Sequence, residues 1–205
     1  MRFYELMYSD FDKEGGYVAT PKGTVHGLIN DAEPPRNDYK DIYYSLVHGV
    51  YRDFMGVTSG GNIVSEELKN VIEQFIPSDY PIEFLPITIH SDLYGDRVYY
   101  FLHFTKIFDV INLEDCDCGG REKTMDNIIK TCLDAEKVEG LPIFNSRPYI
   151  GDVIISDDLK KAIKRRKLDK GASLLELRVS SSDRIIPLES DHPSLWNKIK
   201  RALDR

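Results

Sequence analysis

A phrase of thirteen residues occurs twice in similar form, and this repetition limits the fold more than any other feature of the sequence. "GGNIVSEELKNVI" spans residues 60–72 and "GDVIISDDLKKAI" spans residues 151–163. In both copies a serine precedes two acidic residues and an apolar run at helical spacing. A serine hydroxyl placed there accepts a hydrogen bond from a free backbone N–H of the first turn, and the acids face the positive end of the helix dipole. The phrase therefore predicts two similar capped helices that begin after Ser65 and Ser156.

Nucleophilic catalysis is the other function that these serines could have. A seryl nucleophile needs a nearby base and usually a glycine elbow, and neither copy contains the G-x-S-x-G pattern. Strand patterns also flank the predicted helices, so the internal similarity extends over residues 60–87 and 151–179. We therefore interpret each copy as a strand, a capped helix and a second strand, which builds structure and performs no chemistry.

The rest of the chain adds further strands and one more helix. Residues 82–90 and 97–105 have strand composition on either side of the turn "SDLYGD" and predict a hairpin. The tail, residues 190–205, has an amphipathic helical pattern. Other strands are expected over residues 3–8, 42–48, 107–113, 149–155 and 173–180. The sequence thus predicts an α+β fold in a single domain, residues 1–205: a mixed or antiparallel sheet with two similar capped helices and a C-terminal helix.

The charges are unevenly distributed along the chain. Residues 1–150 hold 14 basic and 25 acidic residues, a balance of −11, whereas residues 151–205 hold 13 basic and 9 acidic residues, a balance of +4. This acidic N-terminal stretch, the acidic front, disfavours nucleic-acid binding and favours a basic partner. No apolar run approaches the roughly 20 residues of a membrane helix, and the first residues alternate where a signal peptide has an apolar core. We therefore expect a cytoplasmic protein.

The cysteines and histidines form no pattern that is typical of catalysis or metal binding. Cys116 and Cys118 are one residue apart, whereas structural zinc sites place about two to four residues between paired cysteines. No second pair follows, and Cys132 stands alone in an apolar run. None of the five histidines lies in an H-E-x-x-H or H-x-E pattern. The sequence therefore predicts reduced, metal-free cysteines, no catalytic residue and no cofactor.

The predicted hairpin is apolar on both faces. When the strands pair symmetrically about the turn, one face carries leucines, isoleucines, a valine and a tyrosine: Leu85, Ile87, Ile89, Val98, Tyr100 and Leu102. A sheet with one face in water alternates between apolar and polar residues. Either packing covers both faces, or one face meets a partner, since tyrosine is enriched at protein interfaces. For the second case the candidate partner-binding residues share the other face: Phe84, Tyr99, Phe101 and His103.

Longer stretches carry a resemblance to a known family. The run "DFMGVTSGGNIVSEELKNVIEQ", followed by "IEFLPITI" and "YYFLHFTKIFDVINLEDC", resembles immunity protein family 11 of bacterial polymorphic toxin systems. "DVIISDDLKKAI" is similar to the second helix start of that family, and "LPIFNSRPYIGD" is similar to the strand and loop before it. The resemblance covers residues 53–180 and, loosely, 1–11, but not 12–50. It departs at Cys116, where the family pattern has a serine or threonine.

The resemblance implies that the protein functions by binding. Members of the family are thought to neutralise a cognate toxin by binding it, so we expect a stoichiometric inhibitor that is not an enzyme. The expected partner is a basic toxin protein, with no nucleic acid and no membrane. Two other interpretations stay open. One is a small enzyme or ligand-binding domain that uses the region of His103 and Cys116, and the other is a homo-oligomer that hides the second face of the hairpin.

Overall fold

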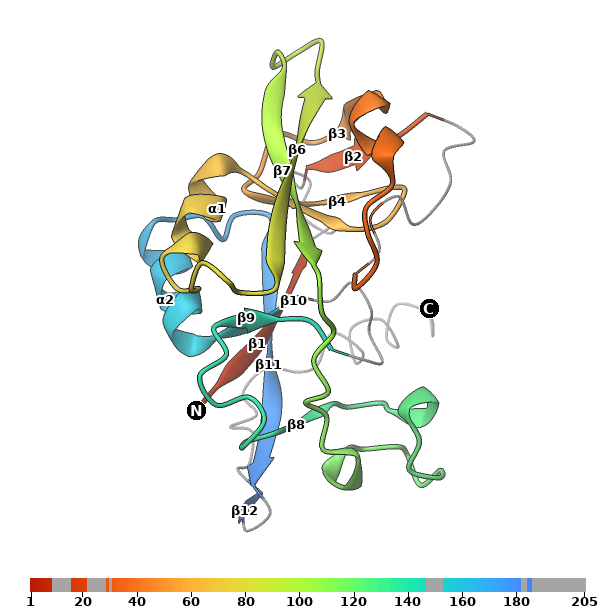
Figure 1. The fold of residues 1–205 in the computed structure, drawn as a ribbon, viewed down its shortest axis with the longest axis vertical. Coiled ribbons are helices and arrows are strands. Elements are labelled where there is room, and N and C mark those ends of the chain that lie inside the picture. The colour runs from red at the N-terminus through yellow and green to blue at the C-terminus, as the bar shows by residue number, and fades with distance from the viewer. Residues whose placement is uncertain (9–15, 22–28, 30, 147–152, 182–183, 186–205) are drawn as a thin grey trace, which may run out of the picture.

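Two β-sheets and two α-helices make up the described part of the computed structural model (Figure 1). The structure describes residues 1–8, 16–21, 29, 31–146, 153–181 and 184–185. The α+β class is confirmed, but the sequence predicted one sheet where the structure has two. The predicted helix over residues 190–205 lies outside the described residues. Within these ranges no helix has the length and apolar character needed to cross a bilayer.

The first sheet is a closed barrel, drawn in the upper half of Figure 1. Two of its pairs, β2 with β4 and β3 with β6, are parallel, and the others are antiparallel. Closure leaves no strand edge free to pair with another chain. The strands follow in barrel order: β2 (Tyr17–Ala19), β3 (Tyr44–His48), β6 (Ile82–His90), β7 (Arg97–Phe104), β5 (Asn62–Val64) and β4 (Phe54–Val57).

The second sheet is open and lies in the lower half of Figure 1. Its strands are β12 (Arg184–Ile185), β11 (Ala172–Ser181), β1 (Phe3–Tyr8), β10 (Val153–Ser156) and β9 (Ile143–Phe144), and β8 (Cys132–Asp134) pairs in parallel with β11. The strand predicted over residues 107–113 is wrong. This stretch makes isolated bridges from Phe108 and Ile111 and then enters a 3-10 turn, Leu113–Asp115. Its apolar residues fill a core without forming a ladder. Two more 3-10 turns are Asn37–Asp41 and Met125–Asn127.

The two similar phrases form units with the same strand order. The first runs β4-β5-β7-β6 and the second β9-β10-β1-β11, and all neighbours in both are antiparallel. Helix α1 (Glu66–Glu73) follows β5, and α2 (Asp157–Arg165) follows β10. In the first unit, β7 is the second strand after α1 and lies between β5 and β6, a position that we call the middle strand. In the second unit the middle strand is instead β1, which comes from the beginning of the chain.

Matching side-chain contacts extend this equivalence beyond the topology. The strand that precedes each helix pairs with a tyrosine of the middle strand, Tyr100 in β7 and Tyr4 in β1. Each helix also places a lysine over that tyrosine. The Lys69 Nζ lies 5.4 Å from the centroid of the Tyr100 ring, and the Lys160 Nζ lies 3.2 Å from the centroid of the Tyr4 ring. The expectation of a single domain over residues 1–205 stays a prediction.

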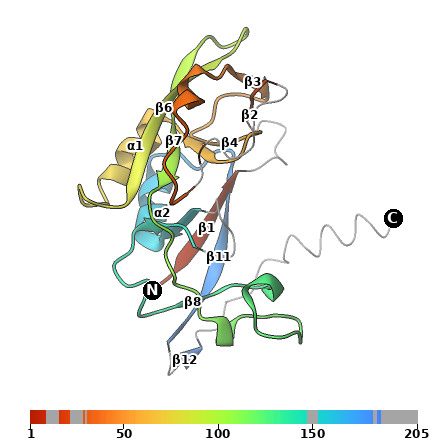
Figure 2. The ribbon, with the colours of Figure 1, turned by 45° about the vertical axis from the view of Figure 1, so that its right-hand side comes forward.

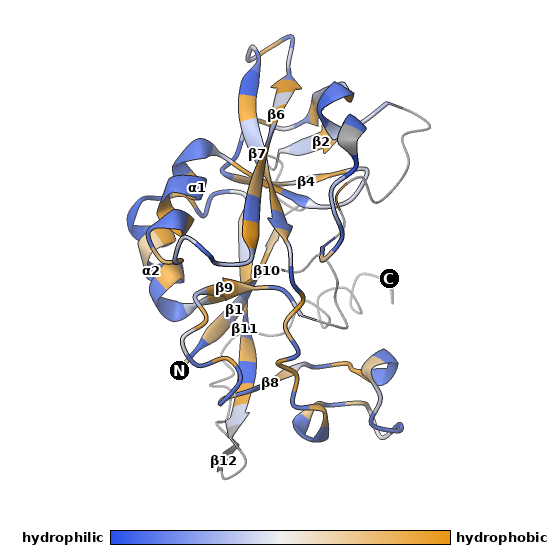
Figure 3. Cartoon of the chain, viewed as in Figure 1, coloured by the Kyte–Doolittle hydropathy of each residue, from blue (hydrophilic) through white to orange (hydrophobic). Residues whose placement is uncertain are grey.

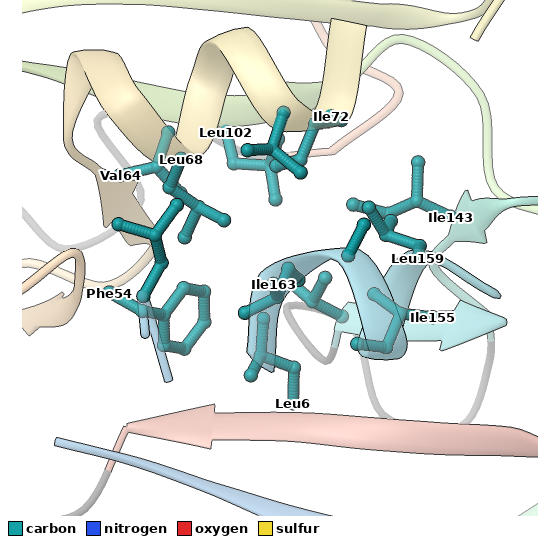
Figure 4. Packing of buried hydrophobic residues seen from close by; sticks show 14 of the residues in the cluster. Leu6, Phe54, Val64, Leu68, Ile72, Leu102, Ile143, Ile155, Leu159 and Ile163 are labelled. Carbon is teal, nitrogen blue, oxygen red and sulfur yellow. The ribbon is translucent and has the colours of Figure 1, made fainter. Parts of the chain in front are cut away.

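Apolar side chains of the two units meet in one core between α1 and α2 (Figure 4). Both helices carry hydrophilic as well as hydrophobic residues, as Figure 3 shows, and they bury only the hydrophobic stripe. A second core fills the barrel, and a third surrounds β8 and β9. The equivalent residues that meet in the shared core are Val64 and Ile155, Leu68 and Leu159, Ile72 and Ile163, and Leu102 and Leu6.

Both predicted helix caps are present, and their removal gives a first test. The Ser65 Oγ accepts from the Leu68 N–H at 3.2 Å and also donates to the Asp53 Oδ1 at 2.6 Å, while the Ser156 Oγ accepts from the Leu159 N–H at 3.4 Å. We expect Ser156→Ala to lower the free energy of unfolding by about 1 kcal/mol. Ser65→Ala should cost more, because it also removes the bond to Asp53. Urea unfolding measures both, and a loss of function at native stability would contradict a purely structural role.

Candidate protein-binding surface

The β6–β7 hairpin pairs one residue away from the symmetrical register expected from the sequence. Ile89 lies opposite Arg97, so His90, the last residue of β6, has no partner in β7 and pairs only with Ser45 of β3. The turn is held by the Gly95 N–H, which donates to the Ser91 carbonyl at 2.9 Å. A shift of one residue moves every side chain of a strand to the opposite face relative to its partner strand. The predicted division of the hairpin into two faces is therefore wrong.

Three of the four predicted partner-binding residues lie inside the molecule. Tyr99, Phe101 and His103 are 3%, 0% and 1% exposed. Tyr99 and Phe101 belong to the barrel core, where the Tyr99 hydroxyl donates to the Arg52 carbonyl at 2.8 Å. Burial raises the pKa of Tyr99, so its hydroxyl stays a neutral donor. Their part in binding a partner stays a prediction.

His103 lies at the end of the barrel between two acceptors. Its Nδ1 is 3.1 Å from the Glu83 Oε2, and its Nε2 is 2.9 Å from the Glu33 carbonyl oxygen. The carboxylate of Glu83 is half exposed, whereas the ring is not. These contacts join the hairpin to the segment that contains Glu33, which is a structural role.

Phe84, the fourth predicted residue, lies on the outer face of the barrel. It is half-buried beside Tyr100, and the Nζ of Lys69 is 5.4 Å from the centroid of each ring. Helix α1 therefore covers this end of the outer face. Farther along the hairpin, Thr88 and Val98 pair with each other and are exposed.

Apolar side chains are exposed again where the hairpin ends. Of the nine large hydrophobic residues that are strongly exposed in the described chain, five come from two short segments, 43–47 and 93–98. Segment 43–47 lies beside the end of β6, the strand that leads into the turn, because β3 pairs with β6. We call the two segments, together with His90, the hairpin-tip surface. Its exposed members are Tyr43 (57%), Val47 (58%), Leu93 (84%), Tyr94 (47%) and Val98 (55%).

Aromatic contacts support this surface from below. The rings of Tyr43 and His90 stack with centroids 4.5 Å apart and planes 2° from parallel, and the His90 Nδ1 is 2.8 Å from the Asp96 Oδ2. The ring of Tyr94 meets that of Tyr51 edge-on, with centroids 6.3 Å apart. Contacts of this kind fix aromatic side chains before a partner arrives and so lower the entropy cost of binding.

Tyr51 also fixes the turn through its hydroxyl. The Oη lies 2.9 Å from the Ile89 carbonyl oxygen and 2.8 Å from the Gly95 carbonyl oxygen, so its proton is shared between the two sides of the turn. Burial raises the pKa of Tyr51, which keeps this donor protonated. The guanidinium of Arg97 lies over the Tyr51 ring, 4.6 Å from its centroid.

Sequence reasoning missed the hairpin-tip surface, although the sequence holds a signal for it. Turns are mostly built from glycine, proline, asparagine, aspartate and serine. The turn "SDLYGD" instead places Leu93 and Tyr94 at its centre. Two large apolar side chains in the middle of a short turn have little to pack against, so their exposure could have been predicted.

A comparison with protein-family models shows to which family the chain belongs. The sequence model of the immunity protein family (Imm11) matches residues 21–176. The chain belongs to this family. The match confirms the resemblance seen in the sequence and extends it over residues 21–50, which had shown no similarity. No curated protein matches the chain.

Among the described residues no group of three or more His, Cys, Asp or Glu side chains is placed to hold a metal ion. A hollow of about 470 Å³ lies between the ends of α1 and α2. It contains no acid, histidine or thiol, and its lining is Gln74, Phe75, Ala162, Arg165 and Arg166.

The cysteines of this Imm11 protein are buried thiols. Cys116 Sγ accepts from the Cys132 N–H at 3.2 Å, and burial raises the pKa of Cys116. All three cysteines, with Cys118, lie in the core around β8. A buried thiol with a raised pKa is a weak nucleophile and a weak metal ligand.

We therefore expect no stoichiometric zinc in the purified protein. Elemental analysis of protein prepared without chelator measures the metal content, and thiol titration in denaturant should find three reduced cysteines per chain. One zinc per chain would contradict this expectation and would revive the interpretation as an enzyme that uses the region of His103 and Cys116.

Proposed function

We propose that the protein is an immunity protein that binds a cognate bacterial toxin domain in the cytoplasm and neutralises it by stoichiometric occlusion. The observation that carries this proposal is the match to the Imm11 immunity family over residues 21–176. The toxin belongs to a polymorphic toxin system, and its gene lies beside that of the immunity protein.

Two physical features support binding as the mechanism. Residues 1–150 carry a balance of −11, which attracts a basic partner over distance and raises the rate of association. The hairpin-tip surface supplies exposed aromatic and aliphatic side chains that a partner can bury, and burial of such side chains determines how slowly a complex dissociates. Neither feature requires a cofactor or a substrate.

Co-expression with the product of the adjacent toxin gene tests the proposal. We expect cells that make the toxin to grow only when they also make this protein. Purified protein mixed with a catalytically inactive toxin should give a one-to-one complex in analytical ultracentrifugation. The association rate should fall as salt rises, because the Debye length shrinks from about 10 Å at 0.1 M to about 3 Å at 1 M.

The two parts of the proposal fail separately. No protection and no complex would remove the immunity function. Protection with an association rate that does not change with salt would keep the immunity function and remove only the attraction between an acidic front and a basic toxin.

A further inference from the structure

We infer that the hairpin-tip surface is the element that enters a basic, concave cleft of the toxin. This inference rests on the proposed function and names the surface and the partner chemistry. Its central segment is the turn of residues 91–96, and its flanks are Tyr43, directly before β3, and Val98 on β7.

The shape of the hairpin suits a cleft. Both views show the end of β6 and β7 projecting beyond the other strands of the barrel (Figure 1, Figure 2). The most exposed large hydrophobic residue of the described chain, Leu93 at 84%, lies in this turn. A projecting turn reaches into a concave site that a flat sheet face cannot enter, and a small-molecule or active-site cleft is concave.

The fold does not require these side chains. In the second unit, β11 and β1 hold the positions of β6 and β7 without being consecutive in the chain, so no comparable turn connects them. The four strands of the second unit therefore take the same arrangement without a turn between the two strands that correspond to β6 and β7. Leu93 and Tyr94 are exposed, so they add little to the hydrophobic stabilisation of the first unit either.

The charge of the turn selects the sign of the partner. The turn and the first residue after it, residues 91–97, contain Asp92, Asp96 and Arg97, which gives a local charge of −1. Asp96 contacts His90, and both carboxylates lie on exposed residues. By contrast, the end of α2 carries Lys164 and Arg165 and would repel a basic partner. An acidic projecting turn fits a cleft lined by lysine or arginine, as in a toxin that acts on a polyanion.

The turn is also held in one shape before binding. The Tyr51 hydroxyl joins Ile89 to Gly95 across the turn, and the stacked pair of Tyr43 and His90 braces its side. A rigid projecting turn loses less conformational entropy on binding than a flexible loop does. Tyrosine is also among the residues that dominate interface energetics.

Variants of exposed side chains, measured against an inactive toxin by surface plasmon resonance, test the inference. The main variants are Leu93→Ala and the double variant Leu93→Ala/Tyr94→Ala, and the matched control is Leu175→Ala, an exposed leucine on β11 of the other sheet. We expect the double variant to raise the dissociation constant at least about 30-fold, which corresponds to one interface hot spot. Leu175→Ala should bind like the wild type. Thermal unfolding should be unchanged for Leu93→Ala, whose side chain has little packing to lose.

A pair of charge variants tests the sign of the cleft. Asp92→Lys should slow association at low salt, and the difference from the wild type should vanish near about 1 M salt, where exposed charges are screened. Glu122→Lys makes the same charge change on an exposed residue far along the chain and should leave the association rate close to that of the wild type.

Each outcome bears on one claim. A wild-type protein that does not bind the toxin overturns the proposed function. A wild-type protein that binds, with tip variants that bind equally well, overturns only the assignment of the hairpin-tip surface. A wild-type dimer that Leu93→Ala/Tyr94→Ala converts to monomer in analytical ultracentrifugation without toxin also overturns it, because the surface then pairs two copies of this chain.

Discussion

Leu68→Asp is expected to abolish the folded state at 25 °C. Leu68 is 1% exposed and lies in the core between the two helices, which also contains the equivalent Leu159 (Figure 4). Removal of a buried leucine costs about 2–5 kcal/mol, and an unpaired carboxylate in an apolar core adds several kcal/mol more. This sum approaches the roughly 5–15 kcal/mol that stabilises a typical protein. Circular dichroism in a urea titration should show no cooperative transition.

Two matched variants test whether the loss of the folded state comes from a carboxylate in the core that the two units share. Leu159→Asp should have an effect of similar size, because the two leucines occupy equivalent positions in one core. Asn70→Asp introduces the same carboxylate on an exposed residue of α1 and should keep the native transition. A folded and stable Leu68→Asp protein would show that the two units do not share a core.

The helix starts could be predicted because their signal is local. Ser65 and the two acids after it lie within one turn of the N–H groups that they satisfy, and the same holds for Ser156. The strand over residues 3–8 could also be predicted, because Tyr4 and Leu6 alternate with residues of the opposite face. Both features depend on neighbours in the sequence, which the printed chain displays directly.

The barrel and the role of β1 could not be predicted, because they depend on pairing between distant segments. The strand β1 resembles β7 in position, with Tyr4 and Leu6 in place of Tyr100 and Leu102, but the two are almost a hundred residues apart. No local pattern states that a strand from the beginning of the chain fills the middle of a unit near residue 155. The equivalence becomes visible only when the strand order is known.

The hairpin faces were mispredicted because the register was wrong by one residue. The strands were correct, with bounds close to those of β6 and β7, but the symmetrical register placed His90 opposite Arg97, where the structure has Ile89. Because side chains alternate with a period of two, that shift placed Tyr99 and Phe101 on the same face as Phe84. The structure puts them inside the barrel and leaves Phe84 outside.

Phe101→Ala tests whether the buried residues of the predicted site act through the stability of the barrel or through contact with the toxin. The ring is 0% exposed and meets the Tyr44 ring edge-on, with centroids 5.8 Å apart, inside the barrel. Deletion of a buried phenylalanine ring costs about 3–5 kcal/mol, so we expect a large fall in the urea midpoint with an unchanged slope. Phe84→Ala, on the half-buried outer face, should cost less.

Binding measured below the unfolding midpoint then separates stability from contact. If Phe101 acts only through the barrel core, the folded fraction of Phe101→Ala should bind the toxin with the affinity of the wild type, and protection in cells should weaken only because less folded protein is present. Fully folded Phe101→Ala protein that has lost affinity would instead show that the barrel opens on the toxin and presents this ring directly. Because the hairpin-tip surface is carried by the same two strands, Leu93→Ala serves as the comparison: it should reduce affinity at wild-type stability, the opposite combination of effects.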